Sequence, residues 1–321
     1  MRNVRPRTVS RAWGCAEREE PERSEQRDEQ GRRRPRSQDQ GDDGLNIHGA
    51  VSGSAQAGQN FLHWTATGEG SWAPYGWAAN DPIGFFDSTF GFYGTTSFQS
   101  VSHAPSGLQI NLKDKAPAKA TQVADLSRVS ARFVVRNNKF LYNRPRGILL
   151  QSSFGIVENN IFIGQTAHGI VVGAASGGEG PGVQNVIFRG NRFSNVGSFP
   201  TMALPTNVHG SYGAVFVAVQ GAGGNIESPN PVHENLIFDS NIFGDLQGPG
   251  LFLSTANNVV LSNNQFINTN LSHVQTANFG TANLSGSVVV TQAHNVYIAK
   301  NSTQGARRPG LFPSTPNQPM E

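Results

Sequence analysis

Charged residues, cysteine and long apolar runs are all scarce in this sequence of 321 residues. The only cysteine is Cys15, so neither a disulfide framework nor a cysteine-based zinc site is expected. No apolar run reaches the roughly 20 residues of a membrane-spanning helix. The first 36 residues also lack the apolar core of a secretory signal. Good helix formers are rare beyond residue 40, where Gly, Asn, Ser and Thr dominate, which excludes a helical bundle or a doubly wound α/β fold.

The few charges are unevenly distributed. Residues 1–40 contain 11 Arg, no Lys and 8 Asp or Glu, which leaves 14 basic and 14 acidic residues in the rest of the chain. The formal charge of +3 therefore comes entirely from the first 40 residues. Because the remaining chain is neutral and offers no basic face, we expect no nucleic-acid partner, and no membrane partner either.

The stretch AEREEPERSEQRDEQGRRRPRSQDQ (16–40) is low in complexity and almost free of apolar residues. Such a composition cannot offset the entropy lost on ordering, so this stretch is predicted to be disordered, and residues 1–40 are interpreted as a disordered or misassigned tail. Three interpretations stay open: a basic arm, a solvated tail, or coding sequence assigned upstream of the true start. The abrupt change to a well-patterned segment favours the third.

From residue 133 onward one template repeats, consisting of an apolar β-rich run, a polar residue, Asn and often Phe. The six copies are FVVRNNKF (133–140), GIVENNIF (155–162), NVIFRGNRF (185–193), NLIFDSNIF (235–243), NVVLSNNQF (258–266) and NVYIAKNST (295–303). Their aligned asparagines are Asn138, Asn160, Asn191, Asn241, Asn264 and Asn301. The shortest spacing is 22 residues and the others are longer, which predicts one rung of a stacked solenoid plus loop insertions.

Short β-branched strands at this period favour a parallel β-helix, which is right-handed by the usual crossover rule. We expect Asn to occupy left-handed corners and to form hydrogen-bonded columns, and the aligned Phe residues to stack inside. The Leu and Asn spacing of leucine-rich repeats is absent, and a β-propeller would need four strands per blade. Residues 50–128 do not follow the template, and alternation in SGLQINLKD (106–114) predicts antiparallel strands there.

The predicted fold is therefore all-β: a right-handed parallel β-helix with an inserted antiparallel β subdomain. The expected boundaries are 41–49 and 129–303 for the β-helix, 50–128 for the insertion, and 304–321 for a loose C-terminal end.

The motif GDDGLNIHG (41–49) is the strongest candidate for chemistry. It places Asp42 and Asp43 immediately before a short strand, which is followed by His48. Glycoside hydrolysis needs one carboxylic acid and one carboxylate, and adjacent like charges set two such groups apart. Both aspartates can act together only if a turn or bulge separates them, because neighbours in a strand point to opposite faces. A plain surface turn is the competing interpretation.

Two further motifs supply polar groups. In NRPRGILLQ (143–151), Arg144 and Arg146 would share a face if Pro145 holds the chain extended, and two guanidinium groups can bind sugar hydroxyls or a carboxylate. In GGEGPGVQNV (177–186), Glu179 lies in a Gly-rich loop and is a candidate acid or base. Either motif can instead be an ordinary solvated turn.

Other candidates have structural explanations. Glu158 and Asp239 occupy a template position that also holds Arg, Ser and Lys, which points to solvent. The histidines are scattered without ligand spacing, so no metal site is expected. Trp64, Trp72, Tyr75 and Trp77 either stack on sugar faces or form the core of the inserted subdomain; of these, Trp72 and Trp77 are the candidate substrate contacts.

The motifs GDDGLNIHG, VRNNKFLYNRPRGILLQSSFGIVENNIF and GEGPGVQNVIFRGNRF together resemble the bacterial α-1,3-galactosidase family of glycoside hydrolases, over roughly residues 41–303. That resemblance implies a right-handed parallel β-helix with an inserted β-barrel, and removal of terminal α-1,3-linked galactose with inversion. It implies no metal or organic cofactor and a secreted or periplasmic location. In that family several rungs precede the Asp pair, whereas here only the polar tail does.

By this resemblance Asp42, Asp43 and Glu179 are catalytic, and His48, Arg144 and Arg146 contact an oligosaccharide or polysaccharide substrate. Two alternatives remain. A polysaccharide lyase would use Arg as base and a cation to neutralise a uronate, but the basic groove for a polyanion is missing. A non-catalytic β-helix would serve in adhesion or carbohydrate binding.

Overall fold

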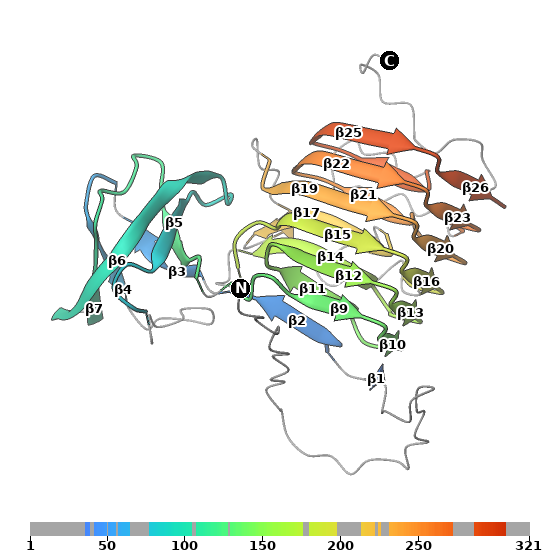
Figure 1. Cartoon of the computed structure of the whole chain (residues 1–321), viewed down its shortest axis with the longest axis horizontal. Helices are drawn as coiled ribbons and strands as arrows, with labels where there is room; N and C mark the ends of the chain where they lie inside the picture. Colours follow the sequence, from blue (N-terminus) through green and yellow to red (C-terminus); the bar gives the residue numbers. More distant parts are fainter. Residues whose placement is uncertain are drawn as a thin grey trace, which may run out of the picture. The chain divides into compact units, whose positions relative to one another are not determined.

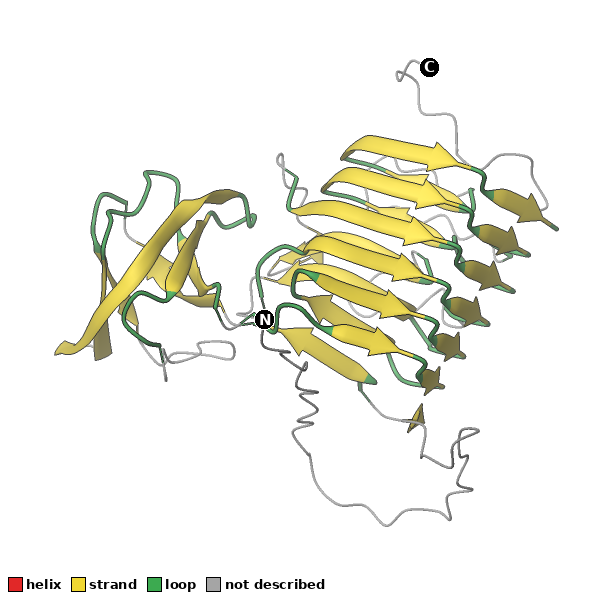
Figure 2. Ribbon diagram, viewed as in Figure 1, coloured by secondary structure: helices red, strands yellow, loops and turns green. Residues whose placement is uncertain are grey.

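The computed structural model describes residues 36–38, 42–49, 51–55, 57–64, 77–104, 107–127, 129–175, 180–197, 213–221, 224–225, 231–271 and 286–305. Every regular element in this part of the chain is a β-strand (Figure 2). Three parallel sheets build a solenoid, in which each turn of the chain contributes one strand to each sheet (Figure 1). The predicted all-β parallel β-helix is therefore confirmed.

The first sheet contains the shortest strands, in the order β1 (Arg36–Gln38), β10 (Lys139–Leu141), β13 (Ile161–Ile163), β16 (Arg192–Ser194), β20 (Ile242–Gly244), β23 (Gln265–Ile267) and β26 (Ser302–Gln304). The second sheet is formed by β2 (Leu45–His48), β11 (Arg146–Gln151), β14 (His168–Ala175), β17 (Val215–Gly221), β21 (Leu251–Leu253) and β24 (Val288–Val290), and β18 (Gly224–Asn225) pairs with β17. The third sheet is formed by β9 (Val134–Arg136), β12 (Gly155–Glu158), β15 (Gln184–Arg189), β19 (His233–Asp239), β22 (Ala256–Ser262) and β25 (Ala293–Ala299).

Strand β1 corrects one expectation, because it lies within residues 16–40, which were predicted to be disordered. Arg36, Ser37 and Gln38 pair in parallel register with Lys139, Phe140 and Leu141. Backbone groups alone can add a strand to an open sheet edge, so the polar composition of this segment does not reveal the pairing.

The inserted antiparallel subdomain is a closed barrel between β2 and β9. Its strand order is β3 (Val51–Ala55), β4 (Phe61–Trp64), β7 (Gly107–Leu112), β6 (Phe92–Ala104), β5 (Pro82–Phe86) and β8 (Gln122–Asp125). Its core includes Leu62, Ile83, Phe85 and Ile110, which are almost completely buried. Because the barrel follows β2 directly, β9 is the edge strand of the third sheet.

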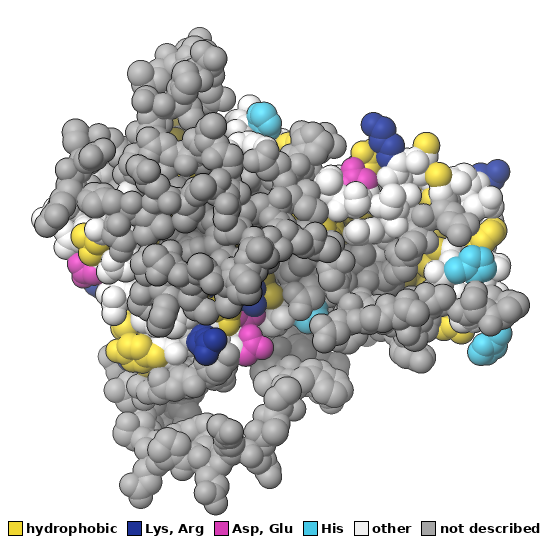
Figure 3. Space-filling view, turned by 180° about the vertical axis from the view of Figure 1, so that it is seen from behind, with side chains coloured by type: hydrophobic (Ala, Val, Ile, Leu, Met, Phe, Trp, Pro, Cys, Tyr) yellow, Lys and Arg dark blue, Asp and Glu magenta, His cyan; other side chains and the backbone are white. Residues whose placement is uncertain are grey.

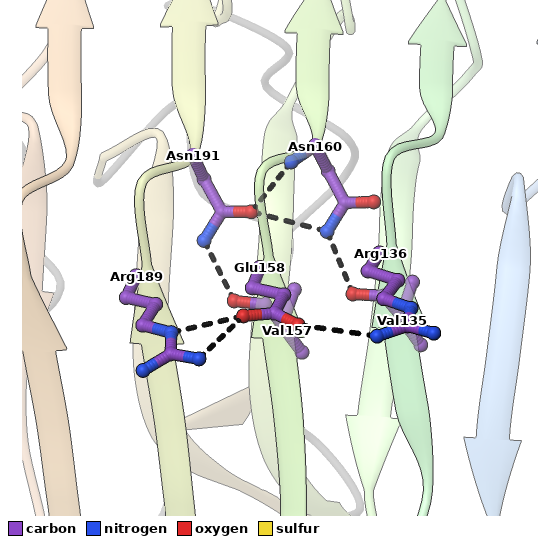
Figure 4. Close-up of polar contacts among 7 residues, drawn as sticks. All are labelled: Val135, Arg136, Val157, Glu158, Asn160, Arg189 and Asn191. Atoms are coloured by element: carbon purple, nitrogen blue, oxygen red, sulfur yellow. Dashed lines mark hydrogen bonds and ion pairs between the residues drawn. The ribbon is translucent and has the colours of Figure 1, made fainter. Parts of the chain in front are cut away.

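The solenoid interior repeats the same contacts from rung to rung. Five phenylalanines stack with ring centroids 4.8–4.9 Å apart and nearly parallel planes, as predicted: Phe140, Phe162, Phe193, Phe243 and Phe266. Beside them the aligned asparagines form a continuous column, of which Figure 4 shows Asn160 and Asn191. For example, Asn160 Nδ2 donates to Asn191 Oδ1 at 3.1 Å and to the Val135 carbonyl at 2.9 Å.

The left-handed corner residues are not the asparagines of this column. The residue before each of them has a φ between 53° and 62°: Asn137, Asn159, Gly190, Ser240, Asn263 and Lys300. The sequence argument assigned both roles to one Asn. The structure divides them between neighbours, because the corner residue turns its side chain outward while the next residue bonds within the stack.

Candidate functional site

Asp43 and Arg146, which are 103 residues apart in the sequence, form an ion pair. The distance from Arg146 Nε to Asp43 Oδ1 is 2.6 Å, and the two side chains are 23% and 9% exposed. Strands β2 and β11 bring them together by pairing in parallel, and the Gly44 N–H donates to the Arg146 carbonyl at 3.1 Å. Two of the motifs selected from the sequence thus meet where these strands begin.

Asp42 lies beside this pair and is exposed. Its Oδ1 accepts a hydrogen bond from the Asp43 N–H at 2.9 Å. Both aspartates precede β2, in a bend rather than in the strand. The alternation that would send adjacent strand residues to opposite faces therefore does not apply to them.

His168 is a neighbour of this pair that the sequence argument missed. It is the register partner of Arg146 on β14, and its Nδ1 lies 2.8 Å from the Gly213 carbonyl oxygen. Its ring stacks on Phe216 with centroids 5.0 Å apart. Burial, together with the Arg146 charge, lowers the pKa of His168 to about 4, so its ring is neutral at pH 7. The sequence does contain a signal for this position, because Arg146-Gly-Ile aligns with His168-Gly-Ile in successive rungs and thereby places His168 beside Arg146.

His48 lies away from the ion pair, at the other end of the same strands. It pairs in register with Gln151, and its Nδ1 is 2.7 Å from the Gly49 carbonyl oxygen. From Arg146 to Gln151 the strand rises roughly 17 Å at about 3.3 Å per residue. The structure therefore does not bring His48 together with Asp43.

The predicted pairing of Arg144 with Arg146 on one extended face is wrong. The Arg144–Pro145 peptide bond is cis, and β11 begins only at Arg146. Arg144 is exposed in the bend before the strand, whereas Arg146 is partly buried against Asp43. The prediction assumed extended chain from Arg144 to Arg146, whereas residues 144 and 145 form a bend.

Glu179 and Trp72 lie outside the described residues. The neighbour of Glu179, Gly180, has a φ of +59°, and a Cβ added there would lie 2.8 Å from Gln151 Cβ. The described flank of that loop therefore lies at the His48 end of the strands. Trp77 is half-buried against the barrel core, with its ring edge-to-face with Phe98 at 5.5 Å. This packing favours the core interpretation of Trp77.

Glu158 and Asp239, which the sequence argument assigned to solvent, make specific ion pairs and hydrogen bonds. Glu158 is only 12% exposed and receives Arg189 Nη2 at 2.8 Å, with Arg136 Nη1 at 4.0 Å on its other side (Figure 4). Hydrogen bonds from Ser262, Asn263 and Ser240 lower the pKa of Asp239. Opposite charges on successive rungs explain why this position accepts either sign.

The described residues contain no cluster of three His, Cys, Asp or Glu that could hold a metal ion. Within the same residues no helix is long and apolar enough to cross a membrane. On the face shown in Figure 3, the described side chains include few Lys or Arg and form no basic stripe.

Comparison with known protein families gives no match, and no curated protein matches the chain. Among solved structures, the tailspike protein gp49 from Pseudomonas phage LKA1 aligns over 82% of this chain with 11% identity and a TM-score of 0.32. The alignment covers 48% of the tailspike chain, so this chain spans about half of its length.

Proposed function

We propose that this protein is a carbohydrate-active β-helix protein, and specifically an inverting glycoside hydrolase that removes terminal α-linked galactose or a similar sugar. The observation that supports the proposal is the Asp43–Arg146 ion pair with Asp42 beside it. It unites an acidic motif and a basic motif that were each selected as substrate-facing from the sequence, at one end of β2 and β11.

The two aspartates are held in different ways, which suits different roles. The charged hydrogen bond from Arg146 fixes the orientation of Asp43, so we assign Asp43 as the carboxylate that activates water. Asp42 is exposed and accepts a hydrogen bond from the Asp43 N–H, and as the second carboxylate of the site it is the candidate proton donor to the leaving oxygen. An inverting pair must be roughly 6.5–9.5 Å apart to admit a water molecule. Glu179, the alternative donor from the sequence, lies outside the described residues, and the flank of its loop is at the His48 end of the strands.

The charge balance of the chain supports a neutral sugar as the substrate. Beyond residue 40 the chain has equal numbers of basic and acidic residues. A lyase acting on polyuronates would need a basic groove and an unpaired Arg or Lys as base, whereas Arg146 is bound to Asp43. Arg144 is exposed, and it is the one basic residue in the bend before β11.

The test measures hydrolysis of p-nitrophenyl α-galactoside and α-1,3-galactobiose by the full chain, with the anomer of the released galactose followed by NMR. We expect β-galactose as the first product. Asp43→Asn should lower kcat by at least about 100-fold, because general base catalysis contributes 10²–10⁴-fold. The matched control is Asp245→Asn, an exposed corner carboxylate on another rung, which should keep full activity.

Two results would contradict the hydrolase. Release of a product absorbing in the ultraviolet from polyuronates would establish the lyase. Binding of galactosides without turnover, unchanged in an Asp42→Asn and Asp43→Asn double variant, would establish a non-catalytic binding protein.

A further inference from the structure

The corner between the first and second sheets carries a left-handed residue in every complete rung, and one of these residues departs from the pattern. The corner residues are Tyr142, Gly164, Asn195, Asp245, Asn268 and Gly305, with φ between 50° and 73°. Gly, Asn and Asp tolerate this conformation well. Tyrosine does not, and a bulky residue there costs roughly 1–2 kcal/mol.

The cost at Tyr142 is not offset by burial, because 54% of the residue is exposed. The Tyr142 ring lies against Gly164, the corner residue of the next rung. A Cβ added at Gly164 would run into this ring. Because Gly164 has no side chain, one side of the Tyr142 ring packs against it. The rest of the Tyr142 side chain is exposed to solvent. An aromatic ring fixed in this way needs no reorganisation before a ligand stacks on it.

Tyr142 is also close to the proposed site along the chain. It lies four positions before Arg146, so their Cα atoms cannot be more than about 14 Å apart. The bend between them contains the exposed Arg144. An exposed aromatic side chain within about 14 Å, between Cα atoms, of the Arg146 that binds Asp43 would add an apolar surface to a few placed polar groups, a combination that is typical of small-molecule sites.

We propose that Tyr142 is a sugar-stacking residue of the site at Asp43 and Arg146, and that it binds the apolar face of a neutral pyranose. This inference rests on the proposed function and names a binding residue for it. The neutral charge balance of the chain beyond residue 40 favours an uncharged sugar over a polyanion.

The experiment compares Tyr142→Asn, Tyr142→Phe and Phe154→Asn in the full chain. Phe154 is the matched control because it has the same exposure, 54%, and a left-handed φ of 59°, but it follows the far end of β11. For α-1,3-galactobiose, Tyr142→Asn should raise KM five- to tenfold, about the loss of one aromatic contact, with kcat unchanged. Tyr142→Phe and Phe154→Asn should keep the wild-type KM.

Stability separates this role from a structural one. Asparagine tolerates the corner conformation better than tyrosine, so Tyr142→Asn should leave Tm unchanged or higher. An unchanged KM in Tyr142→Asn would overturn the proposal, as would a fall in Tm with a matching loss of kcat, or an equal KM effect in Phe154→Asn. A wild-type chain that neither binds nor cleaves a galactoside would instead refute the proposed function itself. Normal turnover that depends on Asp43 but not on Tyr142 would refute only the stacking role.

Discussion

Two columns of polar side chains run up the solenoid across the same turns, and Figure 4 shows a part of both. The asparagine column is buried: Asn160, Asn191, Asn241 and Asn264 are at most 1% exposed. The charged row of Arg136, Glu158 and Arg189 faces outward, and its two arginines are 65% and 53% exposed. One column repeats a single residue type, whereas the other alternates in sign.

Burial accounts for this difference. A buried amide must have its donors and acceptor satisfied, and only another asparagine at the same position of the next rung completes the pattern. A charge at the surface can be satisfied by water, so the outer position tolerates Arg, Glu, Asp or Ser. A polar position that keeps the same residue in every repeat therefore indicates a buried hydrogen bond. A position at which the residue type varies indicates exposure to solvent.

The largest effect should follow from interrupting the buried column. In Asn191→Ala, the Asn160 side-chain and backbone N–H groups lose their acceptor, and the Val157 carbonyl and Asn241 Oδ1 lose a donor. Several buried groups left unpaired at about 1–3 kcal/mol each predict a loss of roughly 3–5 kcal/mol in the free energy of unfolding. Urea denaturation followed by circular dichroism measures it.

The end of the same column provides the control for this prediction. Asn301 is half-buried and accepts from one neighbouring rung, that of Asn264. Water can replace part of what Asn301→Ala removes, so its loss should be about 1 kcal/mol. Equal losses in the two variants would show that burial does not distinguish them.

Much of the solenoid could be predicted from the sequence, because the repeat records contacts that are made again on every rung. The stacked Phe140 and Phe162 and the column asparagines were all recoverable from alignment. Strand β1 was not, because its pairing depends on backbone groups that every sequence has. The division between a left-handed corner residue and the column Asn was also hidden, since both can be asparagine, as in Asn159 and Asn160.

The candidate site was only partly predictable, because it consists of departures from the repeat. Asp43 and Arg146 could be selected as unusual residues, but not their direct contact across 103 residues. Arg144 lies in a bend before β11, a segment that the sequence argument took as extended chain. His168 was overlooked because histidines were judged by ligand spacing, whereas its position follows from the template that it shares with Arg146.

Acid should weaken the fold through the buried histidines, with an intermediate effect. Burial lowers the pKa of His168 and of His233 to about 4, below the ordinary value of 6.5. The unfolded chain therefore binds more protons between these values. The contribution of the neutral histidines to the free energy of unfolding is fully present above pH 6.5. It is lost as the pH drops toward 4, by up to about 3 kcal/mol per histidine.

Urea unfolding at several pH values between 7.5 and 4.5 tests this dependence. Carboxylates contribute at the acid end, so the histidine part is isolated by difference: the wild type should lose more stability than His168→Phe over the same interval. The phenylalanine keeps the stack on Phe216 and removes the titrating group. Parallel curves for the two proteins would show that His168 is not the source.

The smallest effect should come from the outward row, which completes the comparison with the asparagine column. Glu158→Gln removes the charge that Arg189 meets at 2.8 Å but preserves the shape of the side chain. Because both arginines remain more than half exposed, solvent screens the pair and the expected loss is about 0.2–1 kcal/mol. That loss should shrink further in 1 M NaCl, whereas the loss in Asn191→Ala should not, since the asparagine column carries no charge. A Glu158→Gln variant as unstable as Asn191→Ala would mean that the row holds the rungs in register, and that outward charges here act as a buried network does.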